Sequence, residues 1–249
     1  MKVNVKNFKE LVRKATLNLS IDSVQLDVTN ERIESRMVTA HSDGVVLLEV
    51  ENDVITEMTA NDDFQLNFSE PNLNLIPFLN LIDEDEANLF VHENRITMTV
   101  GRQRSNVFFC SPTVVSVFSA GTPLDSVDYF LETNIDENLV EAFKKIRKVG
   151  TKFGRVYFNI EGNTLSIEAT DKRNTVSNTL KFDLLDDVDH GDMSICFAYD
   201  NFQRLMSLIL DDYESFELKI AYIEQQELGM LYIRRSDGSE NFFLMSKVE

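Results

Sequence analysis

Hydrophobic residues recur along this chain first in a helical period and then in the two-residue period of β-strands. A short strand over residues 1–5 precedes a helix whose buried side would carry Phe8, Leu11, Val12, Ala15 and Leu19. Asn7, with Glu10 three residues later, is typical of a capping box and predicts that this helix begins near residue 7. Alternating strands follow, separated by a polar turn over residues 29–32 and by Gly44.

The same helical spacing predicts three further helices. The second follows Pro71, and Pro77 predicts that it is short or irregular. The third ends before Gly150, and the fourth begins near Asp200 with Gln203 in the position of a capping residue. Their buried stripes would be formed by Leu75, Phe78, Leu79 and Ile82, by Leu139, Ala142, Phe143, Ile146 and Val149, and by Phe202, Leu205, Met206 and Ile209.

The pattern of the first half of the chain returns in the second half. Strand positions 24, 26, 28, 33, 35 and 37 match positions 156, 158, 160, 165, 167 and 169 at a constant offset of 132 residues. This repeat predicts an α+β protein of two similar domains, each with two helices against antiparallel sheets. We expect the domains at 1–112 and 128–249, joined by a linker over 113–127 that contains Gly121 and Pro123 and follows neither period.

Length and composition are those of a folded protein. The 249 residues are 43% hydrophobic, without an apolar run long enough to span a membrane and without a charged-then-apolar leader. Cys110 and Cys196 stand in apolar strand-like runs without a CxxC partner, which is typical of buried thiols in a reducing compartment. We therefore expect a soluble cytoplasmic protein that has no membrane partner.

The charge is distributed unevenly along the chain. The formal net charge is −18, but residues 1–14 and 144–156 together hold 11 of the 24 Lys and Arg residues and only one acid, Glu10. Such a separation repels a polyanion from most of the surface and attracts it to one place, although a solvated helix face is the alternative interpretation. Contacts with the phosphates of duplex DNA are predicted for Lys9, Arg13, Lys14, Lys144, Lys145, Lys148, Lys152 and Arg204, with Arg155 nearby.

Sequence motifs for catalysis or cofactor binding are absent. The chain contains no GxxxxGK[ST] or GxGxxG loop, no HExxH and no cysteine–histidine cluster, and His41, His92 and His190 are scattered. We predict no catalytic residue, no metal and no cofactor. A metal-dependent nuclease stays open as an alternative, because its carboxylates need only converge in space.

Several short sequences resemble those of a known family. They are the stretch RSNVFFCSPTVVSVFSAG running into the linker, the ending ENFFLMSKVE with its paired aromatic residues, and Met37 and His41, four apart before VVLLEV. Together with the fourfold repeat of one helix and several strands, they resemble the sliding clamps of the proliferating cell nuclear antigen type over the whole chain. Among these clamps, the resemblance is closest to those of T-even-like bacteriophages.

This resemblance implies a noncatalytic DNA polymerase processivity factor, a closed homotrimer around duplex DNA. It implies that an ATP-driven clamp loader opens the ring and that the ring tethers the replicative DNA polymerase. A phage protein would do so in the cytoplasm of the infected cell. Ring closure would pair residues 104–110 with residues 175–182 of the next subunit. Partner peptides would dock under the linker against Met37, His41, Leu124 and Phe243. The second helix departs from the family, because Asn74, Pro77 and Asn80 stand where clamps often place lysine.

A further alternative has the same two-domain fold without a ring. Some viral processivity factors are monomers that bind DNA on one face and do not encircle it. Oligomeric state, and the dependence of DNA retention on DNA topology, distinguish the two interpretations.

Overall fold

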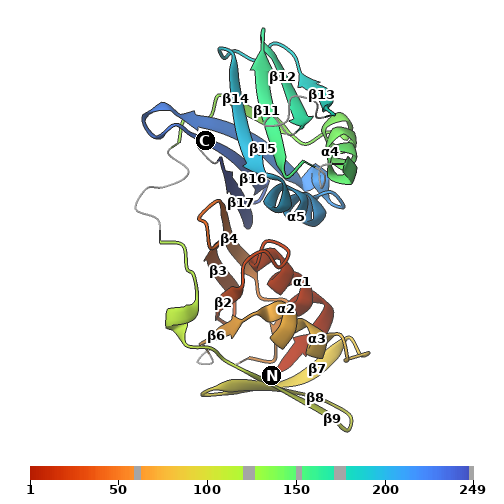
Figure 1. The fold of residues 1–249 in the computed structure, drawn as a ribbon. Coiled ribbons are helices and arrows are strands. Elements are labelled where there is room, and N and C mark those ends of the chain that lie inside the picture. The colour runs from red at the N-terminus through yellow and green to blue at the C-terminus, as the bar shows by residue number, and fades with distance from the viewer. Residues whose placement is uncertain (59–62, 120–126, 150–152, 171–177, 247–249) are drawn as a thin grey trace. The chain divides into compact units, whose positions relative to one another are not determined.

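The computed structural model describes residues 1–58, 63–119, 127–149, 153–170 and 178–246 (Figure 1). The chain divides into two compact units, one formed by Met1–Ala40 with Val45–Ser119 and the other by His41–Gly44 with Ala120–Glu249. Within the described part of the chain, no helix is both long and apolar enough to cross a membrane.

The first unit contains two antiparallel sheets. Its strands are β1 (Lys2–Asn4), β2 (Ser23–Val28), β3 (Arg32–Val38), β4 (Gly44–Glu51), β5 (Ile55–Thr56), β6 (Phe64–Ser69), β7 (Glu86–His92), β8 (Arg95–Val100) and β9 (Gln103–Phe108). Its helices are α1 (Val5–Ala15), α2 (Pro71–Asn74) and α3 (Ile76–Leu79), followed by the 3₁₀ turn η1 (Pro112–Val114). The strands lie side by side in the orders β5-β1-β7-β8-β9 and β4-β3-β2-β6.

The second unit repeats this plan. Its strands are β10 (Leu131–Asn134), β11 (Arg155–Glu161), β12 (Thr164–Ala169), β13 (Leu180–Leu185), β14 (Met193–Ala198), β15 (Phe216–Ile223), β16 (Leu228–Arg235) and β17 (Glu240–Met245). Its helices are α4 (Glu137–Val149) and α5 (Tyr199–Ile209), with 3₁₀ turns η4 (Tyr213–Ser215) and η5 (Glu224–Gln226). The orders β10-β15-β16-β17 and β13-β12-β11-β14 correspond to β1-β7-β8-β9 and β4-β3-β2-β6 of the first unit, and β5 has no counterpart among the described strands. The predicted α+β class is therefore confirmed, and the hairpin β11–β12 returns at the predicted offset from β2–β3.

Packing of the helices on the sheets forms the cores. In the second unit, Phe143 of α4 and Phe202 of α5 meet edge to face at 5.7 Å, and Phe158 of β11 lies 5.7 Å from Phe197 of β14. All four rings are almost completely buried. Burial of each ring contributes roughly 1.5–3 kcal/mol, so this aromatic cluster fixes the positions of α4 and α5 on the sheet.

The capping residues predicted for the first and fourth helices need correction, although the fourth helix begins within one residue of the predicted Asp200. α1 begins at Val5, because the Asn4 side chain accepts a hydrogen bond from the Asn7 backbone N–H at 3.0 Å and so takes the capping role. α5 begins at Tyr199 after Ala198, and no side chain caps it. The predicted first stripe was also too long, because α1 ends at Ala15 and Leu19 follows with positive φ.

The predicted irregularity of the second helix is confirmed. Pro71 occupies the first turn of α2, and the backbone departs from helical geometry at Leu75 before α3 begins. Pro77 has no N–H to donate to the carbonyl of Leu73, so one continuous helix would lose that bond. The break also turns Phe78 outward, which corrects its predicted place in the buried stripe.

The two cysteines are both free and only partly buried, which differs from the predicted full burial. Burial raises the pKa of the Cys110 thiol.

Gly229 of β16 provides a test of packing in the second unit. A Cβ at this position would lie 2.1 Å from Cγ2 of Ile195 in β14. We therefore expect Gly229→Ala to destabilise the protein by about 1–3 kcal/mol in urea unfolding, because a buried side chain must move. Gly191→Ala is the control, since nothing lies within 4 Å of its Cβ position, and equal stability of the two variants would contradict the close packing.

Candidate nucleic-acid interface and partner pocket

α1 turns its basic residues away from the core. The Lys9 ammonium donates a hydrogen bond to Oδ1 of Asn80 at 2.6 Å. Arg13 donates from Nε to Oδ1 of Asn18 at 3.1 Å and lies 3.5 Å from Glu10 one turn earlier. Exposed ion pairs of this kind contribute little to stability, so they exchange readily for contacts with phosphate. Lys14, also on this helix, is half-buried.

α4 gathers its four cations, Lys144, Lys145, Arg147 and Lys148, in its second half. It begins where the Asp136 carboxylate accepts the backbone N–H of Leu139 at 2.9 Å, and its last described residue is Val149. Lys144 and Lys148 are exposed and form no ion pair with any described residue. Because like charges four residues apart on a helix repel, a bound polyanion would relieve this repulsion.

Lys145 has two neighbours on the same surface. Its ammonium pairs with Glu141 four residues earlier and lies 5.4 Å from the centre of the Phe182 ring on β13. The hydrogen bond and charge of Lys145 lower the pKa of the Glu141 carboxyl. Lys145 is therefore less available to phosphate than Lys144 or Lys148. Lys152 lies outside the described residues.

The other two helical segments contribute few cations. On α5 the basic residue is Arg204, which is half-buried. α2 and α3 contain no cation. Leu73 of α2 and Leu81, which follows α3, are each 63% exposed, and Phe78 of α3 is exposed as well. Sequence reasoning missed this apolar surface, because it placed Phe78 in the core.

Within each unit the helices lie together. α1 contacts α3 in the first unit, and α4 contacts α5 in the second, which Figure 1 shows on one side of each unit. We call the predicted phosphate-binding cations of α1 and α4 the basic helix faces; they are Lys9, Arg13, Lys14, Lys144, Lys145 and Lys148.

The described start of the linker runs along β3. Val38 donates its backbone N–H to the carbonyl of Ser116, and Phe118 donates to the carbonyl of Arg36 at 2.9 Å. There is room for this segment because β2 and β3 pair only near their shared turn, through Asp27 with Glu34 and Val28 with Ile33. The linker thus takes hydrogen-bonding positions that β2 leaves open.

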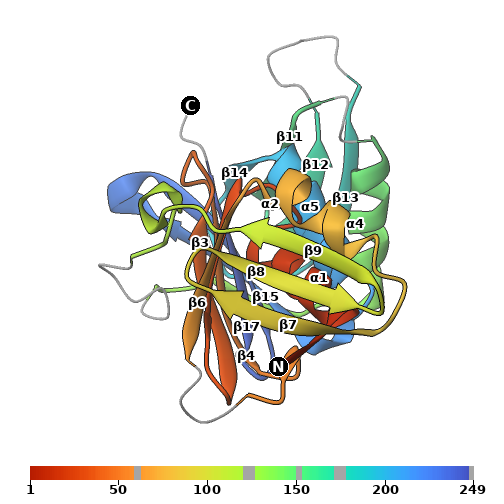
Figure 2. The same cartoon turned by 90° about the horizontal axis from the view of Figure 1, so that it is seen from below.

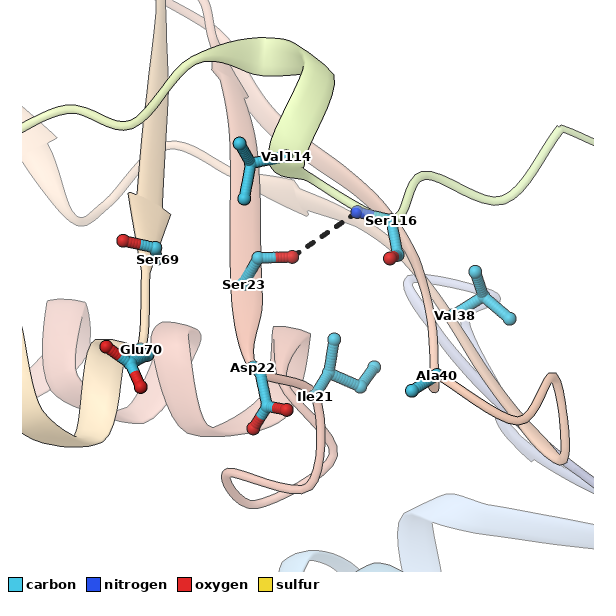
Figure 3. Close-up of a pocket in the computed structure, with 9 residues that line it drawn as sticks. All are labelled: Ile21, Asp22, Ser23, Val38, Ala40, Ser69, Glu70, Val114 and Ser116. Carbon is cyan, nitrogen blue, oxygen red and sulfur yellow. Dashed lines mark hydrogen bonds between the residues drawn. The ribbon is translucent and has the colours of Figure 1, made fainter.

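A cavity of about 350 Å³ lies beside this segment (Figure 3). Val114 and Ser116 of the linker stand over it, and the Ser116 backbone N–H lies 3.3 Å from Oγ of Ser23. Asp22 and Glu70 bring two exposed carboxylates to its other end. The complete lining consists of Ile21, Asp22, Ser23, Val38, Ala40, Ser69, Glu70, Val114 and Ser116.

The predicted partner-binding residues lie outside this lining. Met37 is fully buried, and its sulfur accepts the Gln25 backbone N–H at 3.4 Å. Phe243 is buried and stacks on Tyr232 with ring centres 4.2 Å apart. His41 is exposed, and Leu124 lies outside the described residues. The role of these residues in partner binding stays a prediction.

Across the described residues, no group of three or more His, Cys, Asp or Glu side chains is arranged to hold a metal ion. The histidines are dispersed in the structure as in the sequence. His190 packs against Phe130 with ring centres 4.4 Å apart, and Nε2 of His92 lies 3.1 Å from Oγ1 of Thr97.

Comparison with solved structures shows the fold. The chain matches A. fulgidus PCNA, solved with the C-terminal region of FEN-1, at a TM-score of 0.68 and 14% identity, covering 100% of this chain and 98% of that chain. It also matches a PCNA2–PCNA3 complex from Sulfolobus tokodaii at a TM-score of 0.64 and 16% identity, covering 100% of both chains. A third match is a putative DNA polymerase III beta subunit from Eubacterium rectale. Its TM-score is 0.70 and its identity 12%, covering 100% of this chain and 65% of that one.

These neighbours are sliding clamps, so the chain has the sliding-clamp fold over its whole length, as the sequence predicts. By sequence, no protein-family model and no curated protein matches the chain. The closer relation to clamps of T-even-like bacteriophages stays a prediction.

Proposed function

We propose that this protein is a noncatalytic sliding clamp that encircles duplex DNA and tethers a DNA polymerase. The observation that carries the proposal is the clamp fold over the full chain, with Lys144 and Lys148 of α4 lacking an ion pair among the described residues of a protein of net charge −18. The basic helix faces, with Lys152 and Arg204, would contact phosphates from the inside of the ring. Such contacts do not read bases, so binding would be nonspecific, sensitive to salt and permissive of sliding.

The contribution of the helices to DNA binding would be unequal. α2 and α3 carry Asn74, Pro77 and Asn80 and no cation. α5 adds only the half-buried Arg204. We therefore assign most of the phosphate contacts to α1 and α4.

The ring would be a homotrimer closed by strand pairing. β9 and β13 are edge strands of their sheets, and both leave one row of backbone groups open. The two-residue turn between Val100 and Gln103 makes these residues a hydrogen-bonded pair, so the N–H groups of Arg104, Asn106 and Phe108 point to the open edge. In agreement, Cys110 two residues later donates its N–H away from β8, to Asn67 of β6.

Partner proteins would dock along the linker. Met37, His41, Leu124 and Phe243 remain the residues proposed for a peptide of the polymerase or of an ATP-driven clamp loader. The cavity beside the linker would extend this surface, because it is open, partly apolar and bordered by Asp22 and Glu70. We place the protein in the cytoplasm, in the infected cell if a phage encodes it.

The topology of DNA retention tests the proposal. The protein is assembled with a nicked circular plasmid, closed with an amine cross-linker and washed at high salt, which removes contacts that are only electrostatic. We expect protein to stay with the circle and to leave after a single cut. Retention that survives the cut would instead support a monomeric factor that binds on one face.

A further inference from the structure

In the part of the chain that the structure describes, no other element covers one face of the sheet β7-β8-β9 (Figure 2). Ala87, Leu89, Ile96, Met98 and Val107 point into the core, and the alternate positions point outward. Figure 2 shows β7, β8 and β9 side by side in front of α1. We call the outward side the outer sheet face; on β7 to β9 it is formed by Glu86, Asn88, Phe90, His92, Arg95, Thr97, Thr99, Arg104, Asn106 and Phe108.

Two large aromatic rings stand on this outer sheet face. Phe90 is 52% exposed and Phe108 is 62% exposed, although burial of a phenylalanine is normally favourable by roughly 1.5–3 kcal/mol. Phe90 lies opposite Thr97, and Thr97 lies opposite Asn106, two residues before Phe108. Strand geometry therefore separates the two Cα atoms by about 12 Å, which allows one ligand to touch both rings.

The polar groups between the rings are ordered. Thr97 donates from Oγ1 to Oδ1 of Asn106 at 2.8 Å, and Nε2 of His92 lies 3.1 Å from the same Thr97 oxygen. His92, Thr97 and Asn106 thus form a row of linked polar side chains that crosses the sheet from β7 to β9. Thr97 is buried, so the exposed His92 and Asn106 are the hydrogen-bonding groups offered beside the rings.

The outer sheet face is cationic on a strongly acidic chain. The Arg95 guanidinium lies 6.0 Å from the centre of the Phe108 ring, Arg104 is exposed on the same face, and Arg102 is exposed in the adjoining turn. None of these arginines forms an ion pair with a described residue. Two carboxylates lie on or beside this face. Glu86 lies 3.8 Å from the ammonium of Lys2, and Glu93 is exposed in the turn between β7 and β8.

We propose that the outer sheet face binds single-stranded nucleic acid. Phe90 and Phe108 stack on two non-adjacent bases, and Arg95, Arg102 and Arg104 contact the intervening phosphates. Exposed aromatic rings with interleaved arginines suit this ligand, since every base has a planar π-face and every linkage has a negative charge. An acidic peptide would satisfy the arginines but would not need two separate ring faces. Pairing along the edge of β9 leaves this face open, so the site is compatible with ring closure and does not depend on it.

The test measures fluorescence anisotropy of a fluorescein-labelled dT12 strand with the full chain at low salt. We expect Phe90→Ala with Phe108→Ala to weaken binding at least about thirtyfold, the lower limit for two stacked bases. Arg95→Ala with Arg104→Ala should reduce the slope of log affinity against log salt by about 1.4. Both pairs are on the surface, so thermal unfolding should be unchanged.

The matched control is Phe78→Ala with Leu81→Ala, which removes exposed apolar side chains from α3 and the residues after it. It should leave dT12 binding unchanged. Absence of dT12 binding, or equal binding by the Phe90 and Phe108 variant, would overturn the proposal. Competition by poly-glutamate that depends on the same two rings would also overturn it and assign the face to an acidic polypeptide.

Discussion

Lys144→Ala combined with Lys148→Ala is expected to weaken duplex binding at least about a hundredfold at low salt. Both side chains are exposed on α4, and each copy in a trimer would lose both contacts. If all of these lysines contact phosphate, the slope of log affinity against log salt falls by about 5. Titration of a labelled duplex at several salt concentrations measures both quantities.

The control must remove the same charge elsewhere. Arg32→Ala with Arg36→Ala removes two cations from β3, where both side chains are exposed and have acidic neighbours. We expect it to change duplex binding only slightly. Equal losses in the two double variants would show that net charge alone governs DNA binding and would remove α4 from the proposed interface. Alanine is a good helix former, so α4 itself should remain folded in both cases.

Asn106→Pro is expected to convert the proposed trimer into monomers. The Asn106 N–H points to the open edge of β9, so proline would remove the proposed bond to the neighbouring copy without removing one to β8. In a closed ring, every subunit interface would lose this hydrogen bond. Light scattering at a concentration where the parent protein is trimeric should then give the 28.6 kDa mass of one chain.

Asn106→Ala separates this effect from the loss of the side chain. Both variants remove the hydrogen bond that Oδ1 of Asn106 accepts from Thr97 at 2.8 Å, but only proline removes the backbone N–H. The alanine variant should therefore remain trimeric. A trimeric proline variant with native circular dichroism would exclude β9 as the ring-closing edge.

The elements with strong periodicity were predictable from the sequence. Leu139, Phe143 and Ile146 recur every three to four residues, and the structure buries all three on α4. The repeat at an offset of 132 residues correctly predicted β11 and β12. Their hydrophobic pattern matches that of β2 and β3 in the same chain, so no knowledge of the fold was needed.

Local ambiguity limited the prediction of helix ends. Asn4 and Asn7 are both good capping residues, and the choice between them depends on where β1 stops pairing with β7 at Asn4. Phe78 fits a continuous helical stripe, but the break at Leu75 rotates it outward. The start of α1 and the orientation of Phe78 both depend on tertiary structure, which cannot be predicted from residue spacing alone.

The candidate sites depended on pairing between distant strands. The linker shows neither period, yet it runs beside β3 because β2 diverges from β3 after Val28. Phe90 and Phe108 each occupy an ordinary strand position in the sequence. Only the register through Thr97 and Asn106 shows that both rings share one exposed face.

The mass of the protein in solution tests the central claim most directly, because a ring requires several copies before any DNA is added. Light scattering over a range of concentrations is the measurement. A closed ring predicts a species of about three times the 28.6 kDa chain that dissociates only on dilution. A mass of 28.6 kDa at every concentration would contradict ring closure and favour a processivity factor that binds DNA on one face.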